Sequence, residues 1–138
     1  EIGSGLVGSE MCIRDRYDIP SVELRNALDK IKDKDIERAG DVYSFYHDLA
    51  QSIQTISRKM RKNGYQFWVV GNRTVKGVTL QTDKIIAEIA ETCGLEKIYS
   101  INRNIINKVM PSLNSPSNET GVKSATMTNE HIVVLKKL

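Results

Sequence analysis

The sequence is poor in cysteine, proline and aromatic residues, and it has no long apolar run. Its 138 residues hold two cysteines, Cys12 and Cys93, which form neither a disulfide framework nor metal-ligand spacing, so we expect a reducing, cytoplasmic setting. No apolar stretch approaches the roughly 20 residues that span a bilayer, and no secretory signal is recognisable. His47 and His131 have no neighbours at metal-ligand or catalytic-triad spacing. The sequence therefore predicts neither a membrane protein nor a metal site.

The composition is that of one globular domain with a small excess of positive charge. Hydrophobic residues make up 40% and charged residues 27%, and the net charge of +3 permits an acidic partner without requiring one.

The first 16 residues, "EIGSGLVGSEMCIRDR", differ in character from the rest of the chain. Gly3, Gly5 and Gly8 satisfy G-x-G-x-x-G, but a dinucleotide-binding loop needs a strand before it, and only two residues precede it here. The stretch "GSEMCIRDR" resembles a translated sequencing adapter. We therefore expect residues 1–16 to be a disordered, non-native scar, and native sequence to begin near Tyr17.

Apolar residues at helical spacing predict a short helix and then a long one. Ser21 is suited to cap a helix whose apolar side is formed by Leu24, Leu28 and Ile31. The charged stretch "KDKDIER" that follows is expected to be a solvated turn or a helix start. A long helix is expected over residues 41–62, ended by Asn63–Gly64, with this apolar face: Val42, Tyr46, Leu49, Ile53, Ile56 and Met60.

Three further runs predict strands at residues 65–71, 97–106 and 130–136, and Thr82 is expected to cap a helix over residues 82–93. The run "YQFWVVG" is continuously apolar, which predicts burial on both faces, with Phe67 and Trp68 in the core. A polar connector, "NRTVKGVTLQ", is expected after it. This order of elements indicates an α/β fold in three layers, in which helices flank a mostly parallel sheet closed by an antiparallel strand pair.

The connection formed by residues 107–129 is unusually long and polar, and such connections are commonly functional or disordered. Its segment "NKVMPSLNSPSN", with "VVGNRTVKG" and "NEHIVVLKK", resembles the C-terminal half of site-specific DNA methyltransferases that modify an exocyclic amine of adenine or cytosine. The resemblance covers residues 17–138. It implies a partial class I, Rossmann-like domain, double-stranded DNA as the partner and S-adenosylmethionine as the methyl donor of the full-length parent.

Two motifs of this family are absent from the sequence. It has no Phe-x-Gly-x-Gly turn to hold the cofactor, and its three prolines are never adjacent, so it has no Ser/Asn/Asp-Pro-Pro-Tyr/Phe motif. An exocyclic amine shares its lone pair with the base ring, so the enzyme must flip the base and hydrogen-bond the amine. In the family both motifs would precede Tyr17. We therefore expect a missing N-terminal half, no catalytic residue in this chain, and no activity of the chain alone.

The resemblance also implies a DNA-facing surface. Asn72 is expected to shape the target-base pocket, just beyond the end of a strand, which is the usual ligand side of an α/β sheet. The residues expected to contact DNA phosphates or bases are Arg73, Thr74, Lys76, Arg103, Asn107, Lys108, Asn114, Ser115, Asn118 and Lys123.

Other interpretations remain open from the sequence. These polar segments would also suit ordinary turns and surface loops. The basic run Arg58–Lys62 suits a solvated helix end, with DNA contact as the alternative. The parent could be an RNA methyltransferase, or the chain could be a non-catalytic α/β module that binds nucleic acid or protein.

Overall fold

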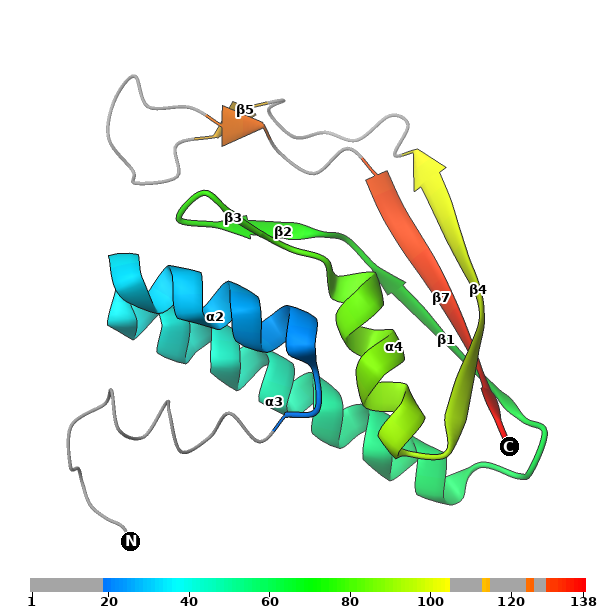
Figure 1. Ribbon diagram of the computed structural model, residues 1–138. Coiled ribbons are helices and arrows are strands. Elements are labelled where there is room, and N and C mark those ends of the chain that lie inside the picture. The colour runs from blue at the N-terminus through cyan, green and yellow to red at the C-terminus, as the bar shows by residue number, and fades with distance from the viewer. Residues whose placement is uncertain (1–18, 105–112, 115–123, 126–128) are drawn as a thin grey trace, which may run out of the picture.

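The computed structural model describes residues 19–104, 113–114, 124–125 and 129–138 (Figure 1). The expected scar at residues 1–16 lies outside the described residues. The helices are α2 (Val22–Lys34), α3 (Ile36–Lys59) and α4 (Thr82–Thr92). The strands are β1 (Tyr65–Val70), β2 (Arg73–Val75), β3 (Val78–Leu80), β4 (Leu95–Asn104), β5 (Leu113–Asn114), β6 (Ser124–Ala125) and β7 (Asn129–Lys137). Within this part of the chain, no helix is long and apolar enough to cross a membrane.

Helices α2 and α3 are separated by one residue, Asp35. Ser21 caps α2 as expected, since its Oγ accepts from the Leu24 amide at 3.1 Å. Asp35 caps α3 in the same way, accepting from the Arg38 amide at 3.1 Å, so the long helix begins at Ile36 and not near residue 41. The charged stretch is therefore a helix start, because the aspartate cap satisfies an amide that has no partner within the helix.

Helix α3 packs through most of its expected apolar face and ends earlier than expected. Tyr46 and Ile53 are fully buried, but Ile56 is 43% exposed and the Ser57 side chain takes the inward position. The Ser57 hydroxyl donates to the Cys93 carbonyl at 2.9 Å. Lys137 Nζ donates to the carbonyls of Ser57 and Met60 at the end of the helix. These carbonyls carry the negative end of the helix dipole, so the lysine stabilises an end at Lys59 instead of residue 62.

The three-stranded sheet has the order β1–β7–β4, and β7 is antiparallel to both neighbours. Strands β1 and β4 consequently run in the same direction, and the chain crosses between them through α4. The expectation of a mostly parallel sheet is wrong for the described strands, because β7 inserts between the two strands that are parallel to each other. The mixed α/β character is confirmed.

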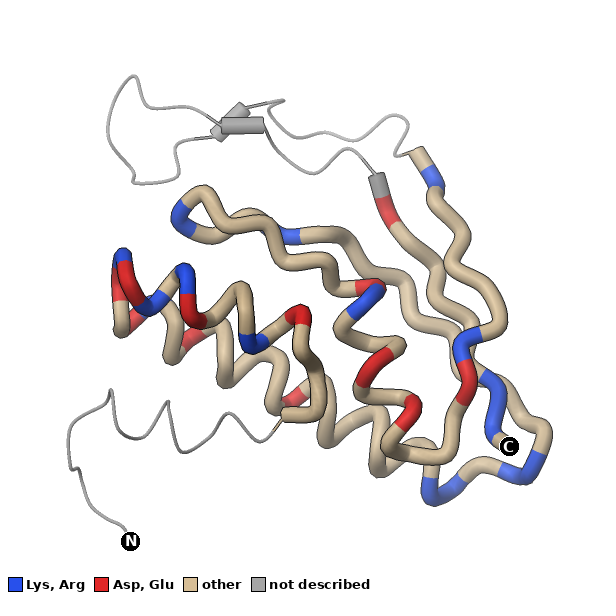
Figure 2. Tube along the Cα trace, in the orientation of Figure 1, with Lys and Arg blue, Asp and Glu red and all other residues tan. Residues whose placement is uncertain are grey.

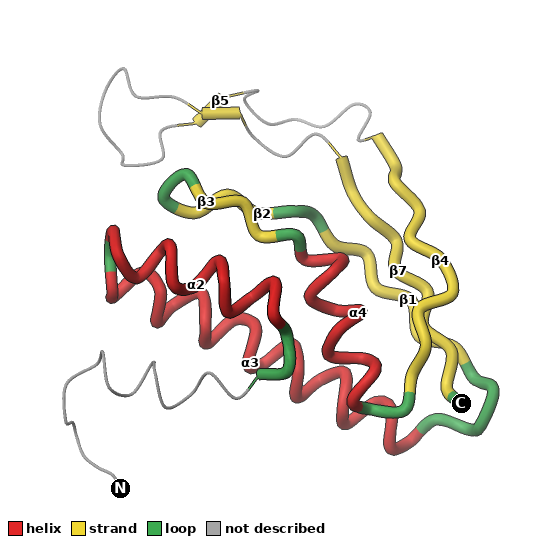
Figure 3. The backbone as a smooth tube through the Cα atoms, in the orientation of Figure 1, coloured by secondary structure: helices red, strands yellow, loops and turns green. Residues whose placement is uncertain are grey.

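The helices lie on one side of this sheet (Figure 3), so the described part has two layers instead of the expected three. Trp68 points to the helices and packs against the core, as expected. Phe67 points the other way and is 66% exposed, so its expected burial is wrong. Alternate residues of a strand face opposite sides, and only one side of β1 is covered here.

The expected polar connector after β1 is a β-hairpin. Strand β2 pairs with β3 in the antiparallel direction, with Val75 opposite Val78. The two turn residues, Lys76 and Gly77, have φ of 51° and 78°, as a two-residue type I′ turn requires. Val75 and Leu80 are buried against the helices, which fixes the hairpin to the body of the protein.

Helix α4 occupies nearly the expected range, but Thr82 is its first residue and not its cap. Ile85, Ile86 and Ile89 are buried, and Gly94 ends the helix region with a φ of 74°. The Glu88 carboxylate accepts hydrogen bonds from the Ser21 hydroxyl and from two amides in the first turn of α2, which holds the two helices together.

The segment expected as a loop at residues 107–129 contains a short ladder. Leu113 pairs with Ala125 and Asn114 with Ser124. The flanking strands also extend beyond their expected limits, since β4 begins at Leu95 and β7 at Asn129.

Candidate functional site

Polar residues gather at the edge of the sheet where β1 and β4 end. Val70 of β1 and Asn102 of β4 both lie opposite His131 of β7, so the carboxyl ends of these two strands lie side by side at one end of the sheet. Asn104 pairs with Asn129, which places both ends of the segment 105–128 at that edge too. We call this region the strand-end surface and define it by Asn72, Arg73, Asp83, Arg103 and His131. The carboxyl ends of strands are where open α/β sheets bind ligands.

Asn72 and Asp83 each present a buried oxygen that lacks a hydrogen bond. Asn72 follows β1, and Asp83 lies in the first turn of α4, where a negative charge suits the helix dipole. The Oδ1 atoms of both residues are buried and have no hydrogen-bond partner within the described part of the protein. A buried acceptor without a donor costs roughly 1–3 kcal/mol, so a donor brought by a ligand would be favourable there.

Asp83 also lies beside His131. The Oδ2 of Asp83 is 3.8 Å from the His131 Nδ1, and the two side chains are 18% and 17% exposed. The carboxylate attracts the imidazole when the imidazole is protonated. The pair comes from α4 and β7, so it joins the helix to the central strand at the strand-end surface.

Arg73 is a cation without a carboxylate partner among the described residues. Its guanidinium carbon lies 4.8 Å from the centre of the Phe45 ring, from α3. Stacking on a ring leaves the guanidinium N–H groups, which lie in the plane of the cation, able to donate to phosphate oxygens. The contact between Arg73 and a DNA phosphate stays a prediction, and this geometry is compatible with it.

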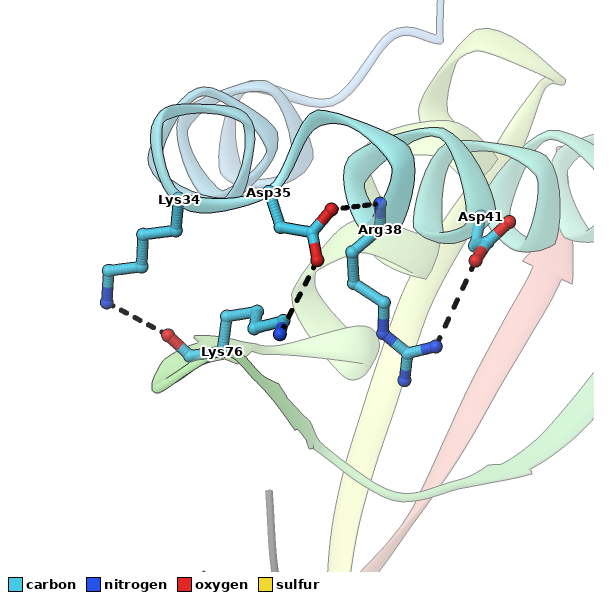
Figure 4. Close-up of polar contacts among 5 residues, drawn as sticks. All are labelled: Lys34, Asp35, Arg38, Asp41 and Lys76. Carbon is cyan, nitrogen blue, oxygen red and sulfur yellow. Dashed lines mark hydrogen bonds and ion pairs between the residues drawn. The ribbon is translucent and has the colours of Figure 1, made fainter. Parts of the chain in front are cut away.

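The hairpin carries Lys76 away from the strand-end surface to the junction of α2 and α3 (Figure 4). Its Nζ is 3.4 Å from the Asp35 Oδ2, and its carbonyl accepts from Lys34 Nζ at 2.9 Å. The hydrogen bond from the Arg38 amide and the nearby Lys76 ammonium hold the pKa of Asp35 below its ordinary value. The charge of Lys76 is thus already paired inside the protein.

Arg103 lies on β4 and is paired with Glu130 of β7 across the ladder. Thr74 is exposed on the outer side of the hairpin, opposite Thr79. Asn114 belongs to β5, and the remaining predicted DNA contacts lie outside the described residues: Asn107, Lys108, Ser115, Asn118 and Lys123. The structure therefore brings Asn72, Arg73 and Arg103 to one edge and separates Lys76 from them.

A second basic region lies at the opposite end of the sheet. Figure 2 shows Lys and Arg where α3 ends and the chain turns into β1, which is the run Arg58–Lys62, and also near the end of β7. This run was the alternative DNA contact from the sequence. The run Arg58–Lys62 and the strand-end surface lie at opposite ends of the sheet. Substitutions in one region can therefore test DNA contact there without changing the other.

Sequence reasoning missed Asp83, Glu130 and His131. Their proximity depends on the β1–β7–β4 register and on where α4 starts, and neither can be recognised from residue spacing. The described residues contain no group of three or more His, Cys, Asp or Glu side chains able to hold a metal ion. A hollow of about 450 Å³ lies between α3 and the far end of α4, beside His47 and Cys93, and no predicted site residue lines it.

Comparison with known proteins identifies a curated relative. The chain is 46% identical over 112 residues to the type II methyltransferase M.MvaI of Kocuria varians. The match covers 81% of this chain and 25% of the relative, so the chain spans about a quarter of the relative's length. No protein-family model matches the chain, and no solved structure matches it.

Proposed function

Because this chain is related to type II DNA methyltransferases, as its sequence indicated, we propose that it forms part of a site-specific enzyme that methylates DNA. The enzyme would transfer a methyl group from S-adenosylmethionine to an exocyclic amine of adenine or cytosine in a duplex. The observation that carries the proposal is the 46% identity, which extends over most of the chain. The polar edge at the ends of β1 and β4 supports a role for this part in holding DNA.

The strand-end surface suits two tasks in such an enzyme. Arg73 would hold a phosphate, since the residue follows the end of β1 and its guanidinium, over the Phe45 ring, has no carboxylate partner in the described region. Asn72 would shape the pocket for the flipped base, because its unpaired Oδ1 can accept from an exocyclic amine.

The residues that the structure describes form no glycine-rich turn of the kind that holds S-adenosylmethionine. Such a turn needs glycines that let the backbone approach the cofactor closely. The glycines with left-handed backbone in the described part, Gly77 and Gly94, lie at the hairpin tip and at the far end of α4. Neither lies at the strand-end surface. We therefore assign cofactor binding to another part of the enzyme, and we expect no methyl transfer by the 138 residues alone.

DNA binding by the chain tests the proposal. Fluorescence anisotropy with a duplex DNA oligonucleotide would give the slope of log affinity against log salt concentration. Arg73→Gln should lower the slope by about 0.9, the value for one phosphate contact, and should weaken binding to all sequences alike. Arg58→Gln is the matched control, since it removes one exposed positive charge from the opposite end of the sheet.

The outcomes separate the alternatives. If the salt slope were unchanged for Arg73→Gln and lowered for Arg58→Gln, DNA would bind at the end of the protein that carries Arg58–Lys62 and not at the strand-end surface. Equal binding of duplex DNA and duplex RNA would argue against a DNA-specific enzyme. Methyl transfer from S-adenosylmethionine by the unmodified chain would refute the assignment of the cofactor site to another part.

A further inference from the structure

The hairpin formed by β2 and β3 has an unusual residue in its turn. Lys76 has a φ of 51° and Gly77 a φ of 78°, so both lie in the left-handed backbone region. A type I′ turn favours asparagine, aspartate or glycine at its first position, because other side chains are disfavoured there. Residues persist in such regions where the surrounding structure holds them, and they are common at functional sites. The contacts of Lys76 should therefore explain why a lysine occupies this position.

Two neighbouring residues at the junction of α2 and α3 hold the tip of the hairpin (Figure 4). The Lys76 Nζ lies 3.4 Å from the Asp35 Oδ2, and the Lys76 carbonyl accepts a hydrogen bond from the Lys34 Nζ at 2.9 Å. Lys76 is thus held both by its side chain and by its backbone. We call Lys34, Asp35 and Lys76 the tip anchor.

Asp35 is itself held by the two helices that it joins. Its amide donates to the Ile31 carbonyl of α2 at 2.8 Å, and its carbonyl accepts from the Ala39 amide of α3 at 3.1 Å. Its Oδ1 accepts from the Arg38 amide, which leaves the Oδ2 for Lys76. Because these bonds fix the carboxylate, the contact with Lys76 restricts little further freedom of Asp35 and sets the position of the hairpin tip.

Among the described strands, no hydrogen-bonded neighbour sets the position of the hairpin instead. Strands β2 and β3 pair only with each other and do not join the sheet formed by β1, β7 and β4. A two-stranded hairpin is marginally stable by itself and depends on packing. Val75, Val78 and Leu80 are buried and supply apolar contact, but such contact is not directional. The polar contacts of the tip anchor are directional, so they fix where the hairpin lies.

The other end of the same hairpin carries residues that are predicted to contact DNA. Arg73 is the first residue of β2, and Asn72 directly precedes it. Arg73 precedes Lys76 by a distance of only about 10 Å in an extended strand, so a displacement of the tip reaches Arg73. The Arg73 guanidinium lies over the ring of Phe45, which belongs to α3, and Asp35 caps the same helix. Helix α3 therefore contacts the hairpin at both of its ends.

We propose that Asp35 is a positioning residue for DNA binding: its carboxylate holds Lys76 at the hairpin tip and thereby fixes Arg73 and Asn72 at the strand-end surface. This inference rests on the proposed function. Asp35 touches no DNA, and Lys76 acts through the protein instead of through a phosphate. The alternative is an ordinary surface ion pair, which would contribute little to stability and nothing to affinity.

The test compares Asp35→Asn with Asp41→Asn in the 138-residue chain, by fluorescence anisotropy with a duplex DNA oligonucleotide. Asparagine caps helices as well as aspartate does, so Asp35→Asn keeps the α3 cap and removes the charge that pairs with Lys76. Asp41 is the matched control. It forms an exposed ion pair with Arg38 on the same helix at 4.0 Å, so Asp41→Asn removes an equal charge from a pair that does not involve the hairpin.

The sign of the change distinguishes positioning from simple electrostatics. Both variants lose one negative charge, which raises the net charge from +3 to +4, and added positive charge by itself favours binding to DNA. Asp41→Asn should therefore leave the affinity unchanged or slightly higher. Asp35→Asn should weaken the affinity about 2- to 30-fold, the range for residues that act on a site through their neighbours. An affinity of Asp35→Asn that equals or exceeds that of the unmodified chain would overturn the proposal.

Further variants test whether Asp35 acts through Arg73. In chains that carry Arg73→Gln, Asp35→Asn should weaken binding much less, because the contact that Asp35 positions is already lost. Equal factors in both backgrounds would overturn the proposal, since residues that act independently contribute additively. Lys76→Met should reproduce the loss seen in Asp35→Asn, and Lys76→Arg, which keeps a cation beside Asp35, should retain the affinity. Full affinity of Lys76→Met would also overturn the proposal.

Hydrogen exchange of the free chain tests the tip anchor without DNA. Amides of residues 73–80 should exchange faster in Asp35→Asn than in Asp41→Asn, because the hairpin tip is held less firmly, and equal exchange would overturn the proposal. Circular dichroism confirms that both variants are folded. If the unmodified chain bound no DNA while the hairpin amides responded as expected, the result would count against the proposed function and support the anchoring of the hairpin by Asp35.

Discussion

The buried hydrogen bond between Tyr46 of α3 and Thr82 of α4 should behave as one unit in unfolding experiments. The Tyr46 hydroxyl and the Thr82 Oγ1 are 2.8 Å apart, and the two residues are 0% and 2% exposed. Tyr46→Phe leaves the threonine hydroxyl buried without its partner, and Thr82→Val does the same to the phenol. Each change should lower the free energy of unfolding by about 1–3 kcal/mol, the cost of a buried polar group left unsatisfied.

The double variant Tyr46→Phe/Thr82→Val should cost no more than either single change. It removes both polar groups, and replacing both partners with apolar groups of similar shape can be nearly neutral. Urea denaturation followed by circular dichroism gives the three free energies, provided that the dependence on urea is the same for all variants. Additive losses in the double variant would refute the reasoning, because residues that share one bond must be coupled.

Tyr46 should also make the free energy of unfolding fall as the pH becomes alkaline. Burial raises the pKa of Tyr46 above its ordinary value of 10.0. The folded protein therefore keeps a proton that the unfolded chain loses, so its stability is complete below pH 10 and falls as the pH rises toward the folded pKa. Tyr46→Phe should show a shallower decline over this window. An unchanged decline would assign the effect to other groups.

Three further changes test the polar contacts. Lys76→Gln should lower the salt dependence of DNA binding less than Arg73→Gln does, because Asp35 already pairs with Lys76, and equal reductions would argue against that difference. Asp35→Asn should reduce the loss of stability in acid. The native Asp35 carboxylate has a lowered pKa, so it stabilises the fold until it is protonated as the pH falls through the folded pKa. Urea midpoints measured from pH 7 down to pH 3 would show this. Ser21→Ala should cost about 1 kcal/mol in thermal or urea unfolding through loss of the α2 cap, whereas Ser52→Ala, at an exposed position of α3, should change stability little.

The helices could be predicted from the sequence because their signals are local. Leu24, Leu28 and Ile31 follow a capping serine at regular spacing, and all three are buried. The β2–β3 hairpin was missed because three-residue strands are too short to show periodicity, although Lys76–Gly77 offered a turn signal. The apolar run of β1 predicted burial correctly for Trp68 but wrongly for Phe67, since composition cannot show which side of a strand is covered.

The site could be predicted only in part. Asn72 and Arg73 were predicted as site residues because they follow a strand, and the structure does place them after β1; their roles stay predictions. The separation of Lys76 depends on the direction of the hairpin and on Asp35, which lies far away in the sequence. The pair of Asp83 and His131 depends on strand order, which no local pattern specifies.

The pairing of Asn104 with Asn129 has a consequence for how proteins of this type can diverge. This pair joins the end of β4 to the start of β7, so the ladder holds the two ends of the stretch 105–128 together whatever the sequence of that stretch. Lengthening a connection between fixed ends adds little entropic cost, roughly 0.6 kcal/mol for each doubling. Insertions, deletions and new side chains in residues 105–128 can therefore accumulate while the sheet stays folded, and we expect recognition preferences to diverge there first.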